Sequence, residues 1–333
     1  MSKPDKLPAV LGVGNALMDI ITQLEDDLIL ATFGLPRGSM TLVDSKLSQQ
    51  IFNATAKNKK EVTTGGSAAN TIRCLASLGG QAGYIGKTGD DELGRTFVQE
   101  FTQKGIKTHM ALSKKDTGRV MGLISTDSER TMATYLGAAA DLLPSDLHSS
   151  LFEGYSYFYM EGYLVQNHEL IKTGFELAKN QKLITAIDLA SYNVVEANLG
   201  FLKEVIKNSV DIVFANEEEA LALTGKAPEE ALQEISEMCD LAVVKVGKEG
   251  SFIQKGSEKI KVSGIPAKAI DTTGAGDSYA AGFLYGLTRG FPLEKCGTVA
   301  SLVAGKVVEV WGANLPDATW EEINKKIRDM ELK

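Results

Sequence analysis

Small residues lie between two aspartates in the segment DTTGAGD, which covers residues 271–277 and precedes a long apolar helical pattern. Small residues let other molecules approach the backbone closely, and the first N–H groups of a helix lack partners within it and carry partial positive charge. Both properties favour a bound anion. We therefore predict that the amides of Gly274, Ala275 and Gly276 bind negative charge at the start of this helix.

Asp277 lies in the first turn of this predicted helix, after a predicted strand that ends near Ile270. The helix dipole favours its ionised form. An ionised carboxylate beside an anion site suits phosphoryl transfer to an alcohol, because the carboxylate accepts the hydroxyl proton while the amides stabilise the charge of the moving group. An ordinary helix start, with Asp277 as a favourable first-turn residue, is the structural alternative.

A second glycine pair precedes another predicted helix in the segment GGSAAN, residues 65–70. The backbone at Gly65 and Gly66 can approach a small polyol, and the amide of Asn70 can both donate and accept hydrogen bonds. Asp19 follows the first predicted strand, where its carboxylate could bind a vicinal diol. A glycine helix cap and a turn aspartate are the corresponding structural alternatives.

The segment FANEEEALALTG places Asn216 and Glu219 where a predicted strand passes into a helix. Their spacing of three puts both side chains on one helix face. Such a pair could orient a Mg²⁺ ion that keeps several of its waters on nucleotide phosphates. An acidic first helical turn is the structural alternative.

The elements that must position these residues alternate along the chain. Short apolar or β-branched runs predict strands at residues 9–14, 82–86, 155–160, 183–188, 211–216 and 241–247. Amphipathic patterns predict helices at residues 68–78, 93–104, 169–179 and 228–238. This order predicts an α/β fold, a doubly wound and mostly parallel sheet with helices on both faces.

Two regions interrupt this alternation. Residues 20–44 and 118–135 read as strands without helices between them, the second as a hairpin around residues 126–130. We predict a small β-sheet lid, built from about residues 16–44 and 108–137, over one end of the main sheet. Edge strands of the main sheet are the alternative. No repeat or linker divides the chain, so we predict a single domain over residues 1–333.

Composition excludes several classes of protein. The formal net charge of −8 provides no basic surface for nucleic acid or for an anionic membrane. The three cysteines are far apart and odd in number, so a disulfide framework or a zinc site is not indicated. The first twenty residues read neither as a signal peptide nor as a membrane-spanning helix. We predict a cytoplasmic protein without nucleic-acid or membrane partners.

Four motifs, taken together, resemble the ribokinase-like (PfkB) family of small-molecule kinases. They are GGSAAN at 65–70, YIGKTGDDELG at 84–94, NEEE at 216–219 and DTTGAGD at 271–277. The resemblance extends from about Val10 to Pro316, with DTTGAGD as its most specific motif. It implies a doubly wound α/β domain with a β-sheet lid, which uses ATP and Mg²⁺ to phosphorylate a hydroxymethyl group.

The resemblance also implies roles for single residues. Asp277 corresponds to the catalytic base and residues 274–276 to the anion hole. The acceptor side is formed by Asp19, Gly65, Gly66 and Asn70. The ATP side comprises Asn216, Lys245, Gly247, Gly250 and Thr273, with Glu219 acting on Mg²⁺ through water. Lys245, in the loop KVGKEG, stands where family members commonly have Ser or Thr, and its cation could face phosphate.

A monovalent-cation site is also implied by the resemblance. Asp271 and the GAN loop at residues 312–314 resemble a site that many family members have, which leaves K⁺ open as a further cofactor. An exposed lid edge could pair between two subunits. We therefore expect either a monomer or a homodimer formed through the lid.

Within the family, the chain is similar to bacterial adenosine-kinase-like members in GVGNALMDI, residues 12–20, and TMATYLGAAADL, residues 131–142. This similarity implies an apolar slot for a purine. The slot would comprise Leu17, Met40, Leu42, Leu136, Ala138 and Tyr163, unless these residues only pack the lid. We predict phosphorylation of the 5′-hydroxyl of adenosine to give AMP. A sugar kinase acting on ribose, fructose or 2-keto-3-deoxygluconate and a non-catalytic nucleoside- or sugar-binding regulator are the alternatives.

Overall fold

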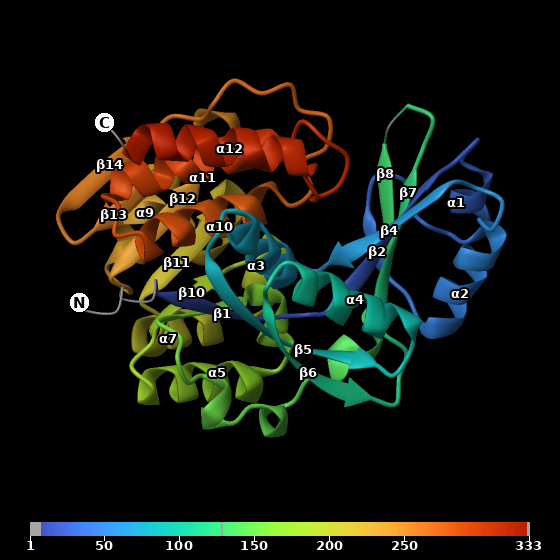
Figure 1. Ribbon diagram of the computed structural model, residues 1–333, viewed down its shortest axis with the longest axis horizontal. Coiled ribbons are helices and arrows are strands. Elements are labelled where there is room, and N and C mark those ends of the chain that lie inside the picture. Colours follow the sequence, from blue (N-terminus) through green and yellow to red (C-terminus); the bar gives the residue numbers. More distant parts are fainter. Residues whose placement is uncertain (1–7, 128, 332–333) are drawn as a thin grey trace.

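Two β-sheets organise the protein, as the computed structural model in Figure 1 shows. The structure describes residues 8–127 and 129–331. The first seven residues, on which the prediction about a signal peptide partly rests, lie outside this range. In the described part of the chain, no helix is long and apolar enough to cross a membrane.

The large sheet contains nine strands within the described residues, in the order β14-β13-β12-β11-β10-β9-β1-β5-β6. Their bounds are β1 (Ala9–Val13), β5 (Gln81–Gly89), β6 (Lys107–Ser113), β9 (Tyr157–Glu161), β10 (Ile184–Asp188), β11 (Ile212–Asn216), β12 (Leu241–Lys245), β13 (Ser251–Lys255) and β14 (Glu258–Val262). Neighbouring strands from β6 to β12 run parallel, and β13 is antiparallel to both of its neighbours. The direction in which strands are added reverses between β1 and β9, and such a point opens a crevice at the carboxyl ends.

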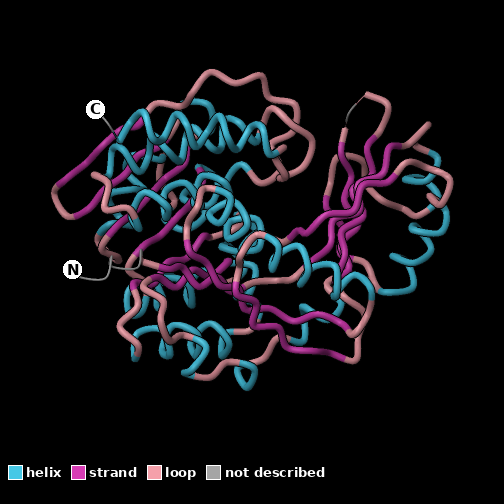
Figure 2. Tube along the Cα trace, in the orientation of Figure 1, coloured by secondary structure: helices cyan, strands magenta, loops and turns pink. Residues whose placement is uncertain are grey.

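Helices cover both faces of this sheet, which confirms the predicted doubly wound fold (Figure 2). One face packs against α3 (Ser67–Ser77), α4 (Glu92–Gln103), α10 (Ala275–Thr288), α11 (Leu293–Val307) and α12 (Asp317–Glu331). The other packs against α5 (His168–Asn180), α6 (Tyr192–Ala197), α7 (Leu199–Ser209), α8 (Glu217–Thr224) and α9 (Pro228–Ser236). Central strands such as β12 are buried along their whole length, which explains their continuous apolar sequence.

The small sheet has the strand order β3-β8-β7-β2-β4. Its strands are β2 (Leu17–Gln23), β3 (Met40–Leu42), β4 (Lys60–Gly65), β7 (Gly118–Ile124) and β8 (Arg130–Tyr135). One face buries Ile20, Met121 and Ala133 beneath α1 (Leu28–Thr32) and α2 (Ser45–Ala54). The pairing register places Leu17, Asp19, Val120 and Arg130 on the opposite face, where Leu17 and Val120 pack with Ala139.

This second sheet excludes the alternative that its strands are edge strands of the main sheet, but its boundaries differ from the prediction. β6 lies inside the second predicted segment and pairs with β5 in the large sheet. β4 was not predicted and forms an edge of the small sheet, where half of its residues face solvent and its sequence is therefore polar. α1 interrupts residues 20–44. Residues 118–135 form the predicted hairpin, of which residue 128 lies outside the described residues.

The predicted strand near Ile270 is wrong. Residues 263–274 form neither helix nor strand between β14 and α10, and Ile270 is 46% exposed. Its apolar side chain therefore gave a misleading signal. The remaining regular segments are short 3₁₀ helices: η1 (Gly137–Asp141), η2 (Pro144–Asp146), η3 (Ser149–Leu151), η4 (Gly162–Gln166) and η5 (Gly247–Glu249).

Candidate active site

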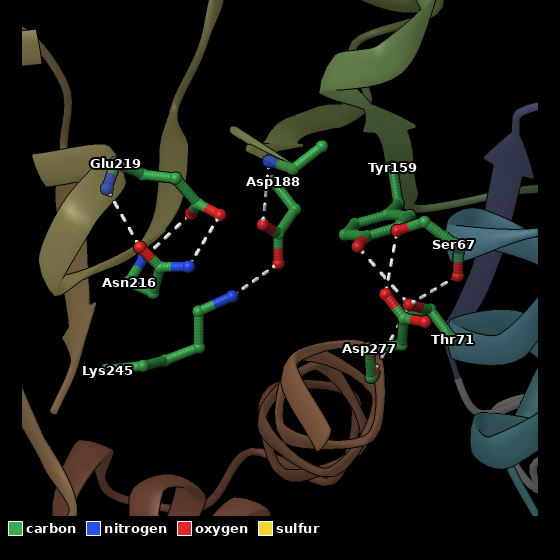
Figure 3. Close-up of polar contacts among 9 residues, drawn as sticks. Ser67, Thr71, Tyr159, Asp188, Asn216, Glu219, Lys245 and Asp277 are labelled. Atoms are coloured by element: carbon green, nitrogen blue, oxygen red, sulfur yellow. Dashed lines mark hydrogen bonds and ion pairs between the residues drawn. The ribbon is translucent and has the colours of Figure 1, made fainter. Parts of the chain in front are cut away.

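Polar residues end four adjacent parallel strands of the large sheet. Glu161 ends β9, Asp188 ends β10, Asn216 ends β11 and Lys245 ends β12. Because carboxyl ends of parallel strands share one edge, these side chains gather at the crevice beside the reversal point. Figure 3 shows Asp277, in the first turn of α10, facing the same place. The structure thus brings residues from distant motifs into one cluster.

Asp277 accepts two hydrogen bonds from α3. Ser67 donates its hydroxyl to Oδ1 over 2.7 Å, and Asn70 donates its amide to Oδ2 over 3.0 Å. Loss of solvent around the carboxylate raises the pKa of Asp277 to about 6, although both hydrogen bonds lower it. The predicted effect of the helix dipole is therefore outweighed by burial. The carboxylate is still mainly ionised at neutral pH and is a stronger proton acceptor than an ordinary aspartate.

The predicted anion-binding turn forms the start of α10. Gly274 is the N-cap with φ 72°, and the N–H of Ala275 already donates to the carbonyl of Thr272 over 3.2 Å. The amide of Ala275 is thus less available than predicted. A Cβ on Gly276 would lie 3.2 Å from Nζ of Lys245, so a cation stands directly beside the turn.

Lys245 forms an ion pair with Asp188, with 2.8 Å between Nζ and Oδ2. Both side chains are buried. Burial lowers the pKa of the Lys245 ammonium, but attraction to Asp188 and Glu219 outweighs burial and leaves the pKa above its ordinary value. The ammonium therefore stays charged. Sequence reasoning missed Asp188, although a carboxylate that ends an apolar strand was an available signal.

Asn216 and Glu219 form a capping box at the start of α8. Oδ1 of Asn216 accepts the N–H of Glu219, and the Glu219 carboxylate accepts the N–H and the side-chain amide of Asn216, each over 2.8 Å. A capping box satisfies backbone N–H groups at a helix start. The first turn of α8 is also acidic, as the structural alternative expected. Burial raises the pKa of Glu219 to about 7, while Lys245 opposes the shift.

The donor set fits Mg²⁺ only loosely. Among the described residues, no group of three His, Cys, Asp or Glu side chains could hold a metal ion. Mg²⁺ commonly keeps several waters and takes its other ligands from one or two carboxylates and from substrate phosphates. A pair such as Asn216 and Glu219 is compatible with such an ion, held mainly by nucleotide and water.

The loop after β12 contains η5 and the two predicted glycines. Gly250 has φ 100°, and a Cβ there would collide with the carbonyl oxygen of Val262. Gly250 is therefore required by the turn itself. A Cβ on Gly247 would lie 4.0 Å from a carboxylate oxygen of Glu217, at the start of α8. The surroundings of Gly247, beside the polar strand ends, are therefore more open than those of Gly250.

The predicted acceptor residues meet where the two sheets join. A Cβ on Gly65 would collide with the carboxylate of Asp19. Burial raises the pKa of Asp19, while Arg130 and Arg73 oppose the shift. Gly66 has φ 99°, and a side chain there would collide with the carbonyl oxygen of Asn15, so only glycine fits.

Glu161 belongs to the same junction and was also missed by sequence reasoning. Its carboxylate accepts the N–H of Asn15 over 3.0 Å and the N–H of Ala68 over 2.8 Å. Burial raises the pKa of Glu161 to about 7, although these hydrogen bonds lower it. Glu161 thus fixes the chain between β1 and β2 against the start of α3.

The predicted apolar slot is only partly assembled. Leu17 and Leu136 pack together in one small cluster of the small sheet, and Ala138 is fully buried nearby in sequence. On the edge strand β3, Met40 is 48% and Leu42 is 63% exposed. Tyr163 is half-exposed in η4, and burial together with the charges of Asp277 and Glu161 raises its pKa.

Asp271 does not resemble an open cation site in this conformation. Its carboxylate accepts hydrogen bonds from the N–H and hydroxyl of Thr273 and from the N–H of Gly312. Nη1 of Arg130, from the small sheet, also donates to it over 2.9 Å. A guanidinium thus already supplies the positive charge, and the residues do not fit K⁺ as arranged. The hydroxyl of Thr273 is used in the same network.

Comparison with known proteins adds independent evidence. The sequence model of the family described as "pfkB family carbohydrate kinase" matches residues 41–320 of this chain. An adenosine kinase from Sinorhizobium meliloti superimposes with a TM-score of 0.85 at 34% identity, over 98% of this chain and 100% of the other. A probable sugar kinase from Rhizobium etli superimposes with a TM-score of 0.87 at 32% identity, over 98% and 99% of the two chains.

A curated relative carries the name of another sugar kinase. The 5-dehydro-2-deoxygluconokinase of Bacillus subtilis is 29% identical over 281 residues, which cover 79% of this chain and 86% of the relative. Similar proteins thus carry names of both nucleoside and sugar kinases.

Proposed function

The chain belongs to the pfkB family of carbohydrate kinases and is an ATP-dependent kinase of a sugar or a nucleoside; from this premise we propose that its acceptor is adenosine. The product would be AMP, formed by phosphorylation of the 5′-hydroxyl. The 34% identity with an adenosine kinase over nearly the whole chain supports this choice. The apolar cluster around Leu17 and Leu136, on the small-sheet face opposite α1 and α2, supports it further, because a purine needs an apolar surface.

Asp277 is the proposed general base, and its position carries the proposal. It lies at the start of α10, between two donors on α3 and the ammonium of Lys245. The acceptor oxygen forms a bond to the γ-phosphorus while the bond from that phosphorus to the β-phosphate oxygen breaks. The hydroxyl proton passes to Asp277, and ADP leaves with the electron pair of the broken bond.

The first turn of α10 is the proposed anion hole, formed by residues 274–276. Its helix N-terminus stabilises negative charge on the moving group. The Ala275 amide would first have to leave the carbonyl of Thr272. This exchange would accompany nucleotide binding.

The acceptor would be held where the two sheets meet. Asp19 would accept hydrogen bonds from the ribose hydroxyls, and the missing side chain at Gly65 lets the Asp19 carboxylate lie against the start of α3. Asn70 already donates to Asp277 and accepts from Arg73 over 2.9 Å, so it would align the base as well as the acceptor. Purine contacts would come from Leu17, Leu136, Met40 and Tyr163.

Kinases of this family generally need ATP and Mg²⁺. Asn216, Lys245 and the loop from Gly247 to Gly250 would face the nucleotide phosphates, with Glu219 acting on Mg²⁺ through water. When bound, Mg²⁺ neutralises phosphate charge. The proposal includes no K⁺ site, because the Asp271 carboxylate is bound by Arg130 and by N–H donors.

A sugar kinase is the second candidate. Its support is the polar part of the small-sheet face opposite α1 and α2, where Asp19 lies near the junction and Arg130 lies at the other end of the sheet, and the sugar-kinase names among similar proteins. A binder without catalysis is not supported, because the family consists of ATP-dependent kinases.

Competition by adenine separates the two candidates. ADP release is measured at limiting adenosine or ribose while adenine is added. A purine slot predicts competitive inhibition by adenine, and Leu136→Asn should weaken that inhibition because a polar side chain would face the base. Leu221→Asn, at an exposed position on α8, is the matched control. Turnover that is indifferent to adenine would contradict the nucleoside proposal and favour the sugar kinase.

A further inference from the structure

Asp188 has no part in the reaction described so far, although it lies at the centre of the polar strand ends. It is 3% exposed and ends β10. Oδ1 accepts the N–H of Ala190 over 3.3 Å, and Oδ2 accepts Nζ of Lys245 over 2.8 Å. Both carboxylate oxygens of Asp188 therefore have defined partners. One partner is in the turn that follows β10, and the other is Lys245 at the end of β12.

The backbone after Asp188 is strained. Ala190 has φ 68°, a left-handed conformation that L-residues with a side chain rarely adopt. Its N–H is the group that binds Oδ1 of Asp188. The local chain thus accepts an unfavourable conformation while it fixes the Asp188 carboxylate. Strain of this kind is often found at functional sites.

Lys245 connects Asp188 to the proposed reaction. Its ammonium lies between the Asn216–Glu219 pair and Asp277, as Figure 3 shows, and beside Gly276 in the anion-binding turn. The ammonium has three N–H donors, and Asp188 accepts one of them. The turn at Gly276 faces the ammonium from another side, where a phosphoryl oxygen would arrive.

A purely structural explanation of this pair is weak. A buried ion pair commonly contributes less to stability than apolar residues of similar size, because both charges lose their water. The strand that ends at Lys245 shows that apolar residues are accommodated next to this position, since Leu241 to Val244 of β12 are all buried. The pair is therefore better explained by the reaction than by the fold.

We infer that Asp188 is a positioning residue, which holds the ammonium of Lys245 against the first turn of α10 so that this cation stabilises the charge on the phosphoryl group in transfer. The inference rests on the proposed kinase mechanism. Lys245 neither gives nor takes a proton in the step, since the hydroxyl proton goes to Asp277. It acts as a fixed positive charge, which is effective where water is excluded.

A double-mutant cycle tests this inference. Lys245→Met should lower kcat by roughly 10²–10³-fold, the usual effect of removing one transition-state donor. Asp188→Asn keeps an oxygen but loses the charge, and should lower kcat on the order of 10–100-fold with little change in the KM for ATP. The double variant should be no slower than Lys245→Met alone, because Asp188 acts only through Lys245.

Other outcomes would overturn the inference. If the effects of the two substitutions on kcat multiply, Asp188 acts on its own. The same conclusion follows if Asp188→Asn mainly raises the Mg²⁺ concentration needed for half-maximal rate. Binding of a non-hydrolysable ATP analogue, measured by calorimetry, should remain within about tenfold of wild type in Asp188→Asn, because the charge is needed mainly in transfer. A loss of analogue binding as large as the loss of kcat would contradict a positioning role.

Controls separate this inference from folding defects and from the proposed function. Lys255→Met, at an exposed position at the end of β13, should leave kcat unchanged. Lys245→Arg keeps the charge and should remain faster than Lys245→Met; equal losses in two folded variants would contradict a fixed-charge role. If Lys245→Met does not fold, Lys245→Arg and the double variant, which buries no unpaired charge, provide the comparison. A wild-type chain that turns over no acceptor would instead contradict the proposed function.

Discussion

Asp277 is held between groups that act on its pKa in opposite directions. Loss of solvent and the charge of Asp188 raise it, whereas Ser67, Asn70 and Lys245 lower it. The other charged groups that interact with this carboxylate are Glu161, Glu219 and Arg73. The balance, a pKa of about 6, leaves a base that is ionised at neutral pH and has a substantial affinity for a proton.

A pH profile tests this arrangement. A base must be deprotonated to act, so kcat/KM should fall as the pH drops below about 6, the pKa of Asp277. Ser67→Ala removes a hydrogen bond that lowers this pKa, and should therefore move the acid limb to higher pH. Ser236→Ala, at a partly exposed position at the end of α9, should leave the limb in place. An unchanged limb in Ser67→Ala would show that another group controls it.

Asp19 provides a separate prediction about the acceptor. Its proposed hydrogen bonds to the acceptor exist both before and during transfer, so Asp19→Ala should raise the acceptor KM with a smaller effect on kcat. Initial rates at varied acceptor and saturating ATP measure this split. An effect confined to the KM for ATP would contradict its place on the acceptor side.

Single residues differed in how far the sequence could predict them. Asp277, Asn70 and Lys245 were identified from motifs, and the structure brings them to one place. Asp188 and Glu161 were missed because each is one carboxylate at the end of an apolar strand, without a motif. Only the parallel pairing of β9 to β12 aligns them with the rest.

At the level of elements, the connections between the two sheets are the critical feature. The chain passes between them near Gly66 and Asn15, and again near Gly118 and Gly137. A Cβ at Gly118 would collide with the carbonyl oxygen of Leu136. Glycines therefore allow the crossing strands to approach closely. We propose that this junction is the hinge of the lid.

Gly66→Ala tests how tightly this junction is packed. A side chain at φ 99° is strained and collides with Asn15, so the substitution should destabilise the fold by roughly 1–3 kcal/mol. Gly200→Ala is the control, because this helical glycine in α7 has open space around it and should gain about 0.5–1 kcal/mol. Thermal unfolding of both variants gives the comparison. Equal stabilities would mean that the junction relaxes freely.

Elements were predicted best where burial was complete. The six predicted strands are all present in the large sheet, because strands buried on both faces have continuous apolar sequences. Half-buried edge strands gave weaker signals. β4 was missed, and β6 was assigned to the lid although it is an edge of the large sheet. Their partners lie far away in sequence, and local patterns do not contain that information.

The whole molecule consists of a large two-faced core and a smaller core under α1 and α2. Besides the crossing strands, the ion pair between Arg130 and Asp271 joins the small sheet to the segment before α10. We propose that the chain acts as one domain, with the small sheet as a lid that excludes water from the phosphoryl group.

Hydrogen exchange tests this movement. Adding the acceptor should slow amide exchange in β2, β4 and the β7–β8 hairpin, because closure buries the face of this sheet that is opposite α1 and α2. The central strands β10 to β12 should change little, since they are already buried, and they serve as the internal control. Equal slowing in both sheets, or none in the small sheet, would contradict lid closure on the acceptor.

At this scale the sequence predicted the fold class and the kinase family, because the motifs extend over nearly the whole chain. It could not predict that Asp271 is bound by Arg130, since that contact joins residues 141 positions apart and depends on how the two sheets lie together. The arrangement of the expected K⁺ site could not be predicted for the same reason.

The most direct test of the account is ADP release with Mg·ATP across adenosine, inosine, ribose, fructose and 2-keto-3-deoxygluconate, for the wild type and for Asp277→Asn. The account predicts fast turnover on adenosine, which Asp277→Asn lowers by roughly 10²–10⁴-fold while adenosine binding persists. Turnover on a free sugar but not on adenosine would contradict the proposed acceptor. A near-normal rate in Asp277→Asn would contradict the assignment of the base.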